Sequence, residues 1–229
     1  MLAKSERESA WREMAKQVSH EIKNPLTPMK LSAQQLQRSY KDGAPDWDSN
    51  LKNFTQTLIE QIDALSNIAS EFSNFAKMPK ANLELLNLSQ TVSSVVSLYQ
   101  NSEEYSVEMN FNNCDKIIVN ADKDQLIRLF NNLIKNAIQA IPNDRKGIIN
   151  VEFSHIENLL KVDVKDNGKG IEEEQKKNIF IPNFTTKNAG MGLGLAMSNS
   201  IVETCIGSIS FTSEINVGTV FSVVFPIVQ

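Results

Sequence analysis

The hydrophobic positions in the first 80 residues recur at helical spacing in two long stretches. The first stretch runs from Ala10 to about Tyr40, and its apolar positions lie three, four or seven residues apart. The second runs from Leu51 to Phe75, with spacings that are nearly all three or four. The apolar positions are Trp11, Met14, Val18, Ile22, Met29, Ala33, Leu36, Tyr40, Leu51, Phe54, Leu58, Ile62, Leu65, Ile68, Phe72 and Phe75. Such spacing gathers apolar side chains on one side of a helix, so the sequence predicts two long amphipathic helices.

The segment between these stretches, KDGAPDWDSN at residues 41–50, is dense in Gly, Pro and Asp and predicts a turn. Two helices of about 30 residues joined by a short loop form an antiparallel hairpin. A single hairpin buries only one face of each helix, which leaves two interpretations. Either a second copy of the chain completes a dimeric four-helix bundle, or the hairpin packs on the rest of its own chain. We favour the homodimer because both helices carry an apolar stripe with the spacing of a packed seam.

After Pro79 the pattern changes to short alternating segments mixed with helical ones. We predict helices at residues 88–101, 122–141 and 192–205, and strands at 105–112, 116–122, 147–156, 159–168, 207–214 and 218–226. Ser89 is the expected N-cap of the first helix, Pro142 ends the second, and the last two strands complete a meander. The predicted fold is α + α/β: a helical hairpin over residues 1–80, then one α/β sandwich over residues 81–229.

Composition narrows the class of protein further. Hydrophobic residues make up 41% of the 229, enough for a packed core, and the net charge of −4 comes without a basic block. We therefore expect neither nucleic acid nor a lipid surface as a partner. The two cysteines, Cys114 and Cys205, are not spaced as in metal-binding or redox motifs. We interpret both as ordinary apolar residues of a protein in a reducing compartment. The chain has no apolar run of 18 residues and starts inside a predicted helix, so we expect a soluble piece of a longer protein.

Two glycine-containing segments have the character of a phosphate-binding site. DNGKGI, residues 166–171, directly follows a predicted strand, and Gly168 and Gly170 permit close approach of the backbone beside the carboxylate of Asp166. GMGLGLA, residues 190–196, opens a helix, where free N–H groups form a cradle for an anion. Taken alone, the first segment is better explained as a simple turn, and the second is only suggestive.

Two further segments supply polar groups. Asn132 and Asn136 are four residues apart and share a helix face, and their amide oxygens suit a hard cation such as Mg²⁺. Two surface asparagines would explain the same pattern. In IFIPNFTTK, residues 179–187, Phe180 and Phe184 could anchor a loop. Its Thr185, Thr186 and Lys187 supply donors for phosphate.

In this order, Asn-x-x-x-Asn, Asp-x-Gly-x-Gly, Phe-Thr-Thr-Lys and Gly-x-Gly-x-Gly resemble the ATP-binding domain of the GHKL superfamily, which includes histidine kinases, gyrase, Hsp90 and MutL. The glycine pattern lacks the strand–loop–helix context of a dinucleotide fingerprint. The resemblance implies that Asp166 accepts the adenine amino group and that Asn136, with Asn132 beside it, holds Mg²⁺ against the phosphates. It further implies a triphosphate wrapped by the backbone of Gly190, Gly192, Leu193 and Gly194, with Lys187 neutralising charge and Thr219 near the nucleotide. Residues 185–189 would form a short ATP lid.

The segment SHEIKNPLTP, residues 19–28, places a histidine and two prolines inside the first predicted helix. An imidazole offers a neutral nucleophilic nitrogen near pH 7, and the adjacent Glu21 can hold the proton on the other ring nitrogen. Pro25 and Pro28 remove two helical N–H donors, so we expect a bend beside His20. The bend is either a switch that exposes one histidine to ATP at a time or a static kink. His155 has no such neighbours and no expected catalytic role.

This segment is similar to the phosphoacceptor box of dimeric sensor histidine kinases. Its residues resemble most those of the nitrogen-regulation branch. The resemblance implies autophosphorylation of His20 from ATP, transfer to an aspartate on the receiver domain of a response regulator, and a phosphatase role for Asn24 in orienting water. It also implies the cytoplasmic part of a bacterial sensor with a membrane anchor upstream. Two alternatives stay open: a GHKL ATPase or serine kinase, and a dimeric scaffold that binds nucleotide without kinase activity.

Overall fold

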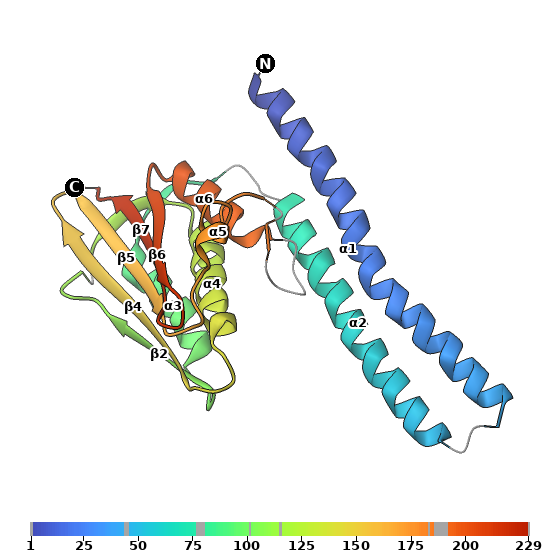
Figure 1. Ribbon diagram of the computed structural model, residues 1–229. Coiled ribbons are helices and arrows are strands. Elements are labelled where there is room, and N and C mark those ends of the chain that lie inside the picture. The colour runs from blue at the N-terminus through green and yellow to red at the C-terminus, as the bar shows by residue number, and fades with distance from the viewer. Residues whose placement is uncertain are drawn as a thin grey trace. The chain divides into compact units, whose positions relative to one another are not determined.

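The computed structural model describes residues 2–43, 46–76, 81–100, 102–114, 116–182, 184–185 and 192–228 (Figure 1). The chain divides into two compact units. One consists of residues 1–78 with 183–193, and the other of residues 79–182 with 194–229. Each unit is described by itself.

The first unit contains the predicted hairpin. Helix α1 (Leu2–Lys41) and helix α2 (Trp47–Ala76) run side by side in opposite directions (Figure 1). The turn is shorter than predicted, because α2 already begins at Trp47 within the segment expected to be a turn. The Trp47 ring lies 5.5 Å from that of Tyr40, and the Asn50 amide donates to the Ser39 hydroxyl at 3.3 Å. These contacts join the two helix ends and extend α2 toward the turn.

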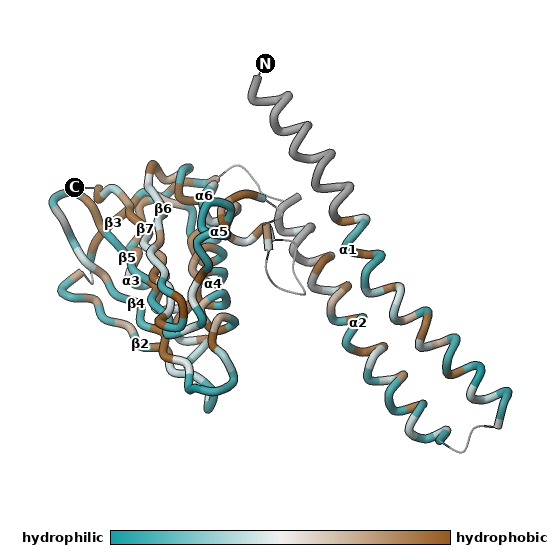
Figure 2. The backbone as a smooth tube through the Cα atoms, viewed as in Figure 1, coloured by the Kyte–Doolittle hydropathy of each residue, from teal (hydrophilic) through white to brown (hydrophobic). Residues whose placement is uncertain are grey.

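Helix α1 continues through both prolines as one uninterrupted helix. Pro25 is buried, and the Thr27 hydroxyl donates to the main-chain oxygen of Lys23 at 3.0 Å in this turn. A bend at this point stays a prediction. In the coloured parts of both helices, polar and apolar residues alternate (Figure 2). The exposed apolar side chains of the hairpin include Ile22, Leu26, Leu31, Ile59 and Ile62. The side chains of Trp11, Met14, Phe72 and Phe75 lie outside the described residues.

The second unit is an α/β sandwich in which helices cover one face of a sheet (Figure 1). Its elements are β1 (Glu84–Asn87), α3 (Leu88–Val96), a 3-10 turn (Ser97–Tyr99), β2 (Tyr105–Asn110), β3 (Ile118–Ala121), α4 (Lys123–Ala140), β4 (Gly147–Ile156), β5 (Leu159–Asp166), α5 (Glu173–Lys176), α6 (Gly194–Thr204), β6 (Ser208–Glu214) and β7 (Gly218–Pro226). Phe130 of α4, Phe153 of β4 and Phe225 of β7 are fully buried between the helices and the sheet. Strand β1 and helix α5 were not predicted from the sequence.

The strand order of the main sheet is β2-β4-β5-β7-β6, and β1 pairs with β3 in a separate two-stranded sheet. The predicted meander is therefore wrong, because β7 pairs with both β5 and β6 and lies between them. The burial of the two strands gives the reason. Strand β7 buries Phe221, Val223 and Phe225, whereas the alternate residues of β6 remain exposed, as suits an edge strand.

Two of the differences from the predicted helix ends have local reasons. Asn87, not Ser89, is the N-cap of α3, because its side-chain oxygen accepts the Gln90 N–H at 3.2 Å. Ser89 lies inside the helix, buried, and donates to the main-chain oxygen of Cys114 at 2.6 Å. Helix α4 ends one residue early because Ile141, which precedes Pro142, takes an extended conformation.

Candidate functional site

One face of α4 brings the predicted asparagines together with the start of α6. The Asn132 amide donates to the Ser198 hydroxyl at 2.9 Å, and the Asn136 amide makes a longer contact, 3.5 Å, with Oδ1 of Asn132. Helix α6 begins at Gly194, inside the second glycine run and two residues after the predicted start at residue 192. A β-carbon on Gly194 would lie 2.2 Å from Oδ1 of Asn132, so the glycine leaves room for the Asn132 side chain in this position. The first turn of α6 thus lies directly against the asparagine face of α4.

Asp166, at the end of β5, is buried with only 4% of its surface exposed. Its Oδ1 accepts the N–H groups of Gly168 at 2.8 Å and of Thr219 at 3.2 Å. Burial raises the pKa of this carboxyl above its ordinary value, and the two backbone N–H groups oppose that effect. Two backbone donors hold Oδ1 of the carboxyl in a defined orientation.

The loop after Asp166 rests on the end of α4. The N–H of Lys169 donates to the main-chain oxygen of Ala140 at 2.9 Å, and a β-carbon on Gly168 would lie 2.8 Å from that oxygen. Ala140 follows Asn136 by four residues on the same helix face. The asparagines and the Asp166 loop therefore lie along one side of α4 rather than at separate places in the domain.

The turn between β6 and β7 holds the other side of this loop. The N–H of Asn216 donates to the main-chain oxygen of Lys169 at 3.0 Å, and that of Ile171 donates to the Ser213 hydroxyl at 2.9 Å. Gly170 has a φ of +74°, and a β-carbon there would lie 2.3 Å from the main-chain oxygen of Glu214. A glycine is required at position 170 on both counts.

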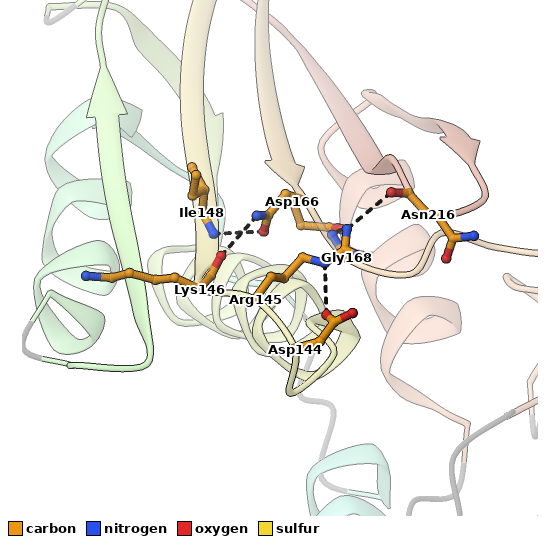
Figure 3. Close-up of polar contacts among 8 residues, drawn as sticks. Asp144, Arg145, Lys146, Ile148, Asp166, Gly168 and Asn216 are labelled. Carbon is orange, nitrogen blue, oxygen red and sulfur yellow. Dashed lines mark hydrogen bonds and ion pairs between the residues drawn. The ribbon is translucent and has the colours of Figure 1, made fainter.

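Asn167 ties the same loop to the start of β4. Its amide nitrogen donates to the main-chain oxygen of Lys146 at 3.0 Å, and its amide oxygen accepts the Ile148 N–H at 2.8 Å. Figure 3 shows Asp166 and Gly168 beside this bridge, with Arg145 reaching toward Asn216. Arg145 donates to the Asn216 main-chain oxygen at 3.2 Å and pairs with Asp144. The loop is thus fixed from β4, α4 and the β6–β7 turn.

Sequence reasoning missed four residues that shape this site: Ser198, Asn167, Ser213 and Gly218. Thr219 was expected near the nucleotide, and its hydroxyl lies 2.9 Å from that of Ser213. Gly218, which precedes it, has a φ of +136° and packs against the backbone of Asp166. The sequence offered one signal for the role of Gly218, namely a glycine directly after the Asn216–Val217 turn.

The phosphate-binding segment is described only in part. Gly192 has a φ of +62°, and a β-carbon there would lie 2.4 Å from the main-chain oxygen of Phe184. Phe184 is half-buried, and Leu193 is buried. Three predicted residues, Thr186, Lys187 and Gly190, lie outside the described residues.

The phosphoacceptor candidates lie on α1 in the hairpin unit. His20 and Asn24 are exposed, and Glu21 between them is half-buried. His155 is exposed on β4. Within the described ranges, no three His, Cys, Asp or Glu side chains gather as a metal site, and no helix there has the length and apolar character that a membrane crossing requires.

Comparison with known proteins identifies both parts of the chain. Residues 121–229 match the family model of the histidine kinase-, DNA gyrase B- and HSP90-like ATPases, and residues 10–80 match the His Kinase A phospho-acceptor domain. The catalytic domain of the histidine kinase ThkA, solved without nucleotide, is 30% identical with a TM-score of 0.57 and covers 63% of this chain and 95% of that one. The chain therefore belongs to the histidine kinases and contains their phospho-acceptor and ATPase domains in that order.

Longer relatives extend the match to nearly the whole chain. It is 32% identical to nitrogen regulation protein NtrY of Azorhizobium caulinodans over 88% of this chain and 27% of that protein. Sporulation kinase A of Bacillus subtilis is also 32% identical, over 99% of this chain and 36% of that kinase. ThkA in complex with response regulator TrrA has a TM-score of 0.76 at 26% identity and covers 98% of this chain and 64% of that chain. The chain thus spans about a third or less of these two curated relatives.

Proposed function

We propose that the chain transfers the γ-phosphoryl group of ATP to His20 and then passes it to an aspartate on a response-regulator receiver domain. The observation that carries this proposal is the arrangement along α4. At one end Asn132 bonds Ser198 of α6 and Asn136 contacts Asn132, and at the other the loop that follows the buried Asp166 bonds Ala140. This arrangement supplies an anion-binding helix start and an oriented carboxylate on one helix face.

The residues fit a nucleotide with its metal. Asp166, whose Oδ1 is held by two backbone donors, accepts a hydrogen bond from the adenine amino group. The phosphates bind at the helix start at Gly194, together with the backbone of Gly190, Gly192 and Leu193. Phe184 anchors the segment that carries Thr186 and Lys187, and Gly168, Gly170 and Thr219 hold the base-binding loop. The Asn136 amide oxygen is a hard ligand of the kind that Mg²⁺ accepts alongside phosphate oxygens and water. The ATP-binding domain has a net negative charge and does not neutralise the phosphates. Magnesium, when bound, supplies the positive charge that does.

His20 has the exposure that a phosphoacceptor requires. Its Nε2 attacks the γ-phosphorus as the bond to ADP breaks. The ring keeps its Nδ1 proton, which donates a hydrogen bond to Glu21, and the Glu21 carboxylate stabilises the positive charge that develops on the ring. Phosphoryl transfer requires mainly alignment and charge neutralisation from the protein. Asn24, one helical turn on, orients the water that removes the phosphoryl group from the receiver aspartate.

The hairpin offers binding surfaces for two protein partners, a second copy of the chain and a receiver domain. Large apolar side chains stay exposed on both of its helices, Leu31 at 60% and Ile59 at 56%. A second copy of the hairpin would cover them in a four-helix bundle, with the domain boundary near residue 80. The receiver domain docks on the bundle beside His20. By kinship, the chain is the cytoplasmic portion of a bacterial sensor anchored in the membrane by a segment upstream.

Incubation of the full chain with Mg²⁺ and γ-labelled ATP tests the proposal. A label that is stable to alkali, labile to acid and lost in His20→Ala supports it, and addition of a receiver domain then removes that label. An acid-stable label instead indicates a serine kinase. Release of phosphate without a protein label indicates an ATPase, and tight nucleotide binding with neither indicates a scaffold.

A further inference from the structure

Three hydrogen bonds run in sequence from the backbone of α6 to Asn136. The Ser198 hydroxyl donates to the main-chain oxygen of Gly194 at 2.9 Å. The Asn132 amide nitrogen donates to that same hydroxyl oxygen at 2.9 Å. The Asn136 amide nitrogen then faces Oδ1 of Asn132 at 3.5 Å. Ser198 is almost fully buried, with 1% of its surface exposed, so bulk water has little access to the hydroxyl that makes the first two of these contacts.

The direction of this chain follows from the number of protons available. A serine hydroxyl has one proton, and a main-chain oxygen can only accept. The Ser198 proton therefore goes to Gly194, and the hydroxyl oxygen can only accept from Asn132. Asn132 must then turn its amide nitrogen toward Ser198, which turns its amide oxygen toward Asn136.

The same logic fixes the orientation of the Asn136 side-chain amide. Asn136 meets an oxygen at Asn132, so its amide nitrogen must face that oxygen and its own Oδ1 is directed elsewhere. An asparagine amide has nearly the same shape in its two flipped orientations, so packing alone does not distinguish them. With the amide reversed, a partly positive nitrogen would face the place where a cation binds.

We propose that Ser198 is a positioning residue that sets the orientation of the Asn136 amide through Asn132, and thereby presents an oxygen to the metal ion of a magnesium–nucleotide complex. The inference rests on the proposed function, which assigns that metal to Asn136. Ser198 touches neither nucleotide nor metal and acts through Asn132. Outer-shell partners of this kind alter metal affinity by roughly tenfold or more when removed.

The test compares nucleotide binding with and without magnesium in one protein. A fluorescent ATP analogue is titrated into the full chain in excess Mg²⁺ and in EDTA, and the ratio of the two dissociation constants is the gain due to the metal. Ser198→Ala is expected to reduce this gain about tenfold while the affinity in EDTA stays within about twofold of the unmodified chain. Ser198→Thr retains a hydroxyl on the same carbon and is expected to keep most of the gain.

Ser89→Ala is the matched control. Ser89 is also buried in the same domain and donates to a main-chain oxygen, that of Cys114, which is not a residue of the site. Its loss should lower stability without changing the magnesium gain. If Ser198→Ala keeps the full gain, or if Ser89→Ala loses it equally, the proposal is overturned.

A measurement on the unmodified chain needs no variant. Nuclear Overhauser contacts from the Asn132 side-chain amide protons to the β-protons of Ser198 are expected, and their absence in the folded protein overturns the proposal. Failure of the proposed function has a different signature, because the unmodified chain would then bind nucleotide with no magnesium gain at all.

Discussion

Gly218 lies so close to the backbone of Asp166 that a β-carbon at position 218 would come within 1.9 Å of the Asp166 main-chain oxygen. The φ of Gly218, +136°, is also one that side chains rarely permit. The next residue, Thr219, donates its N–H to the Asp166 carboxyl. Gly218 therefore allows β7 to approach β5 closely enough for Thr219 to orient that carboxyl.

The substitution Gly218→Ala should disturb both the fold and the site. We expect the free energy of unfolding of the α/β domain to fall by at least about 2 kcal/mol, because the new side chain is strained and meets backbone. Nucleotide affinity should fall as well, because Asp166 loses its orientation. Chemical denaturation and titration with a fluorescent nucleotide measure the two effects. Gly43→Ala is the control, since Gly43 also has a positive φ but no neighbour within 4 Å; it should leave nucleotide affinity unchanged, and equal affinity in both variants would contradict the argument.

The pKa of Asp166 predicts a pH dependence of stability. Burial raises the pKa in the folded state, so the folded chain binds this proton more tightly than the unfolded chain does. The resulting stability is complete below the ordinary Asp pKa of about 3.9 and is lost as the pH rises through the higher folded value. Asp166→Asn retains an oxygen for both backbone donors but has no charge, so it should remove this part of the pH dependence without unfolding the domain.

The same variant separates folding from binding. An asparagine at position 166 can turn an amide nitrogen toward the adenine amino group, where two donors would face one another. We expect Asp166→Asn to fold at pH 7 with unreduced stability and to lose nucleotide binding, as denaturation curves and nucleotide titration at one pH would show. Normal ATP binding by Asp166→Asn would show that Asp166 does not make the proposed contact with adenine.

The features predicted correctly from the sequence are those that depend on local pattern. The predicted bounds of the strands at residues 147–156 and 218–226 agree with β4 and β7, because alternation and flanking turn residues act within each segment. The strand order was missed because it depends on which strand tolerates the edge of the sheet. Ser198 was missed for a similar reason: its role depends on the contact between α4 and α6, which no spacing along the chain encodes.

Asn167 should contribute to nucleotide binding although it is directed away from Asp166. Its amide replaces a backbone partner at the end of the β4–β5 ladder, where it both donates to Lys146 and accepts from Ile148. Asn167→Ala removes both bonds, so we expect stability to fall by about 1–3 kcal/mol and nucleotide affinity to fall with it. The control is Asn199→Ala, because the Asn199 amide donates to the exposed Glu203 on its own helix. Denaturation and nucleotide titration check both variants, and a loss of affinity in the control alone would refute the role of Asn167.

Pro25 tests whether the interrupted hydrogen bonding beside His20 is used in signalling. Pro25 is buried within a continuous α1, and it lacks the N–H that would bond the main-chain oxygen of Glu21. A proline inside a helix costs about 3 kcal/mol relative to alanine, so Pro25→Ala should raise the melting temperature of the hairpin despite the loss of some buried surface. If the prolines permit a switch between two helix shapes, the stiffer helix should also change the ratio of autokinase to phosphatase rates, measured with labelled ATP and a phosphorylated receiver domain. A higher melting temperature with both rates unchanged would show instead that the prolines form a static feature of the helix.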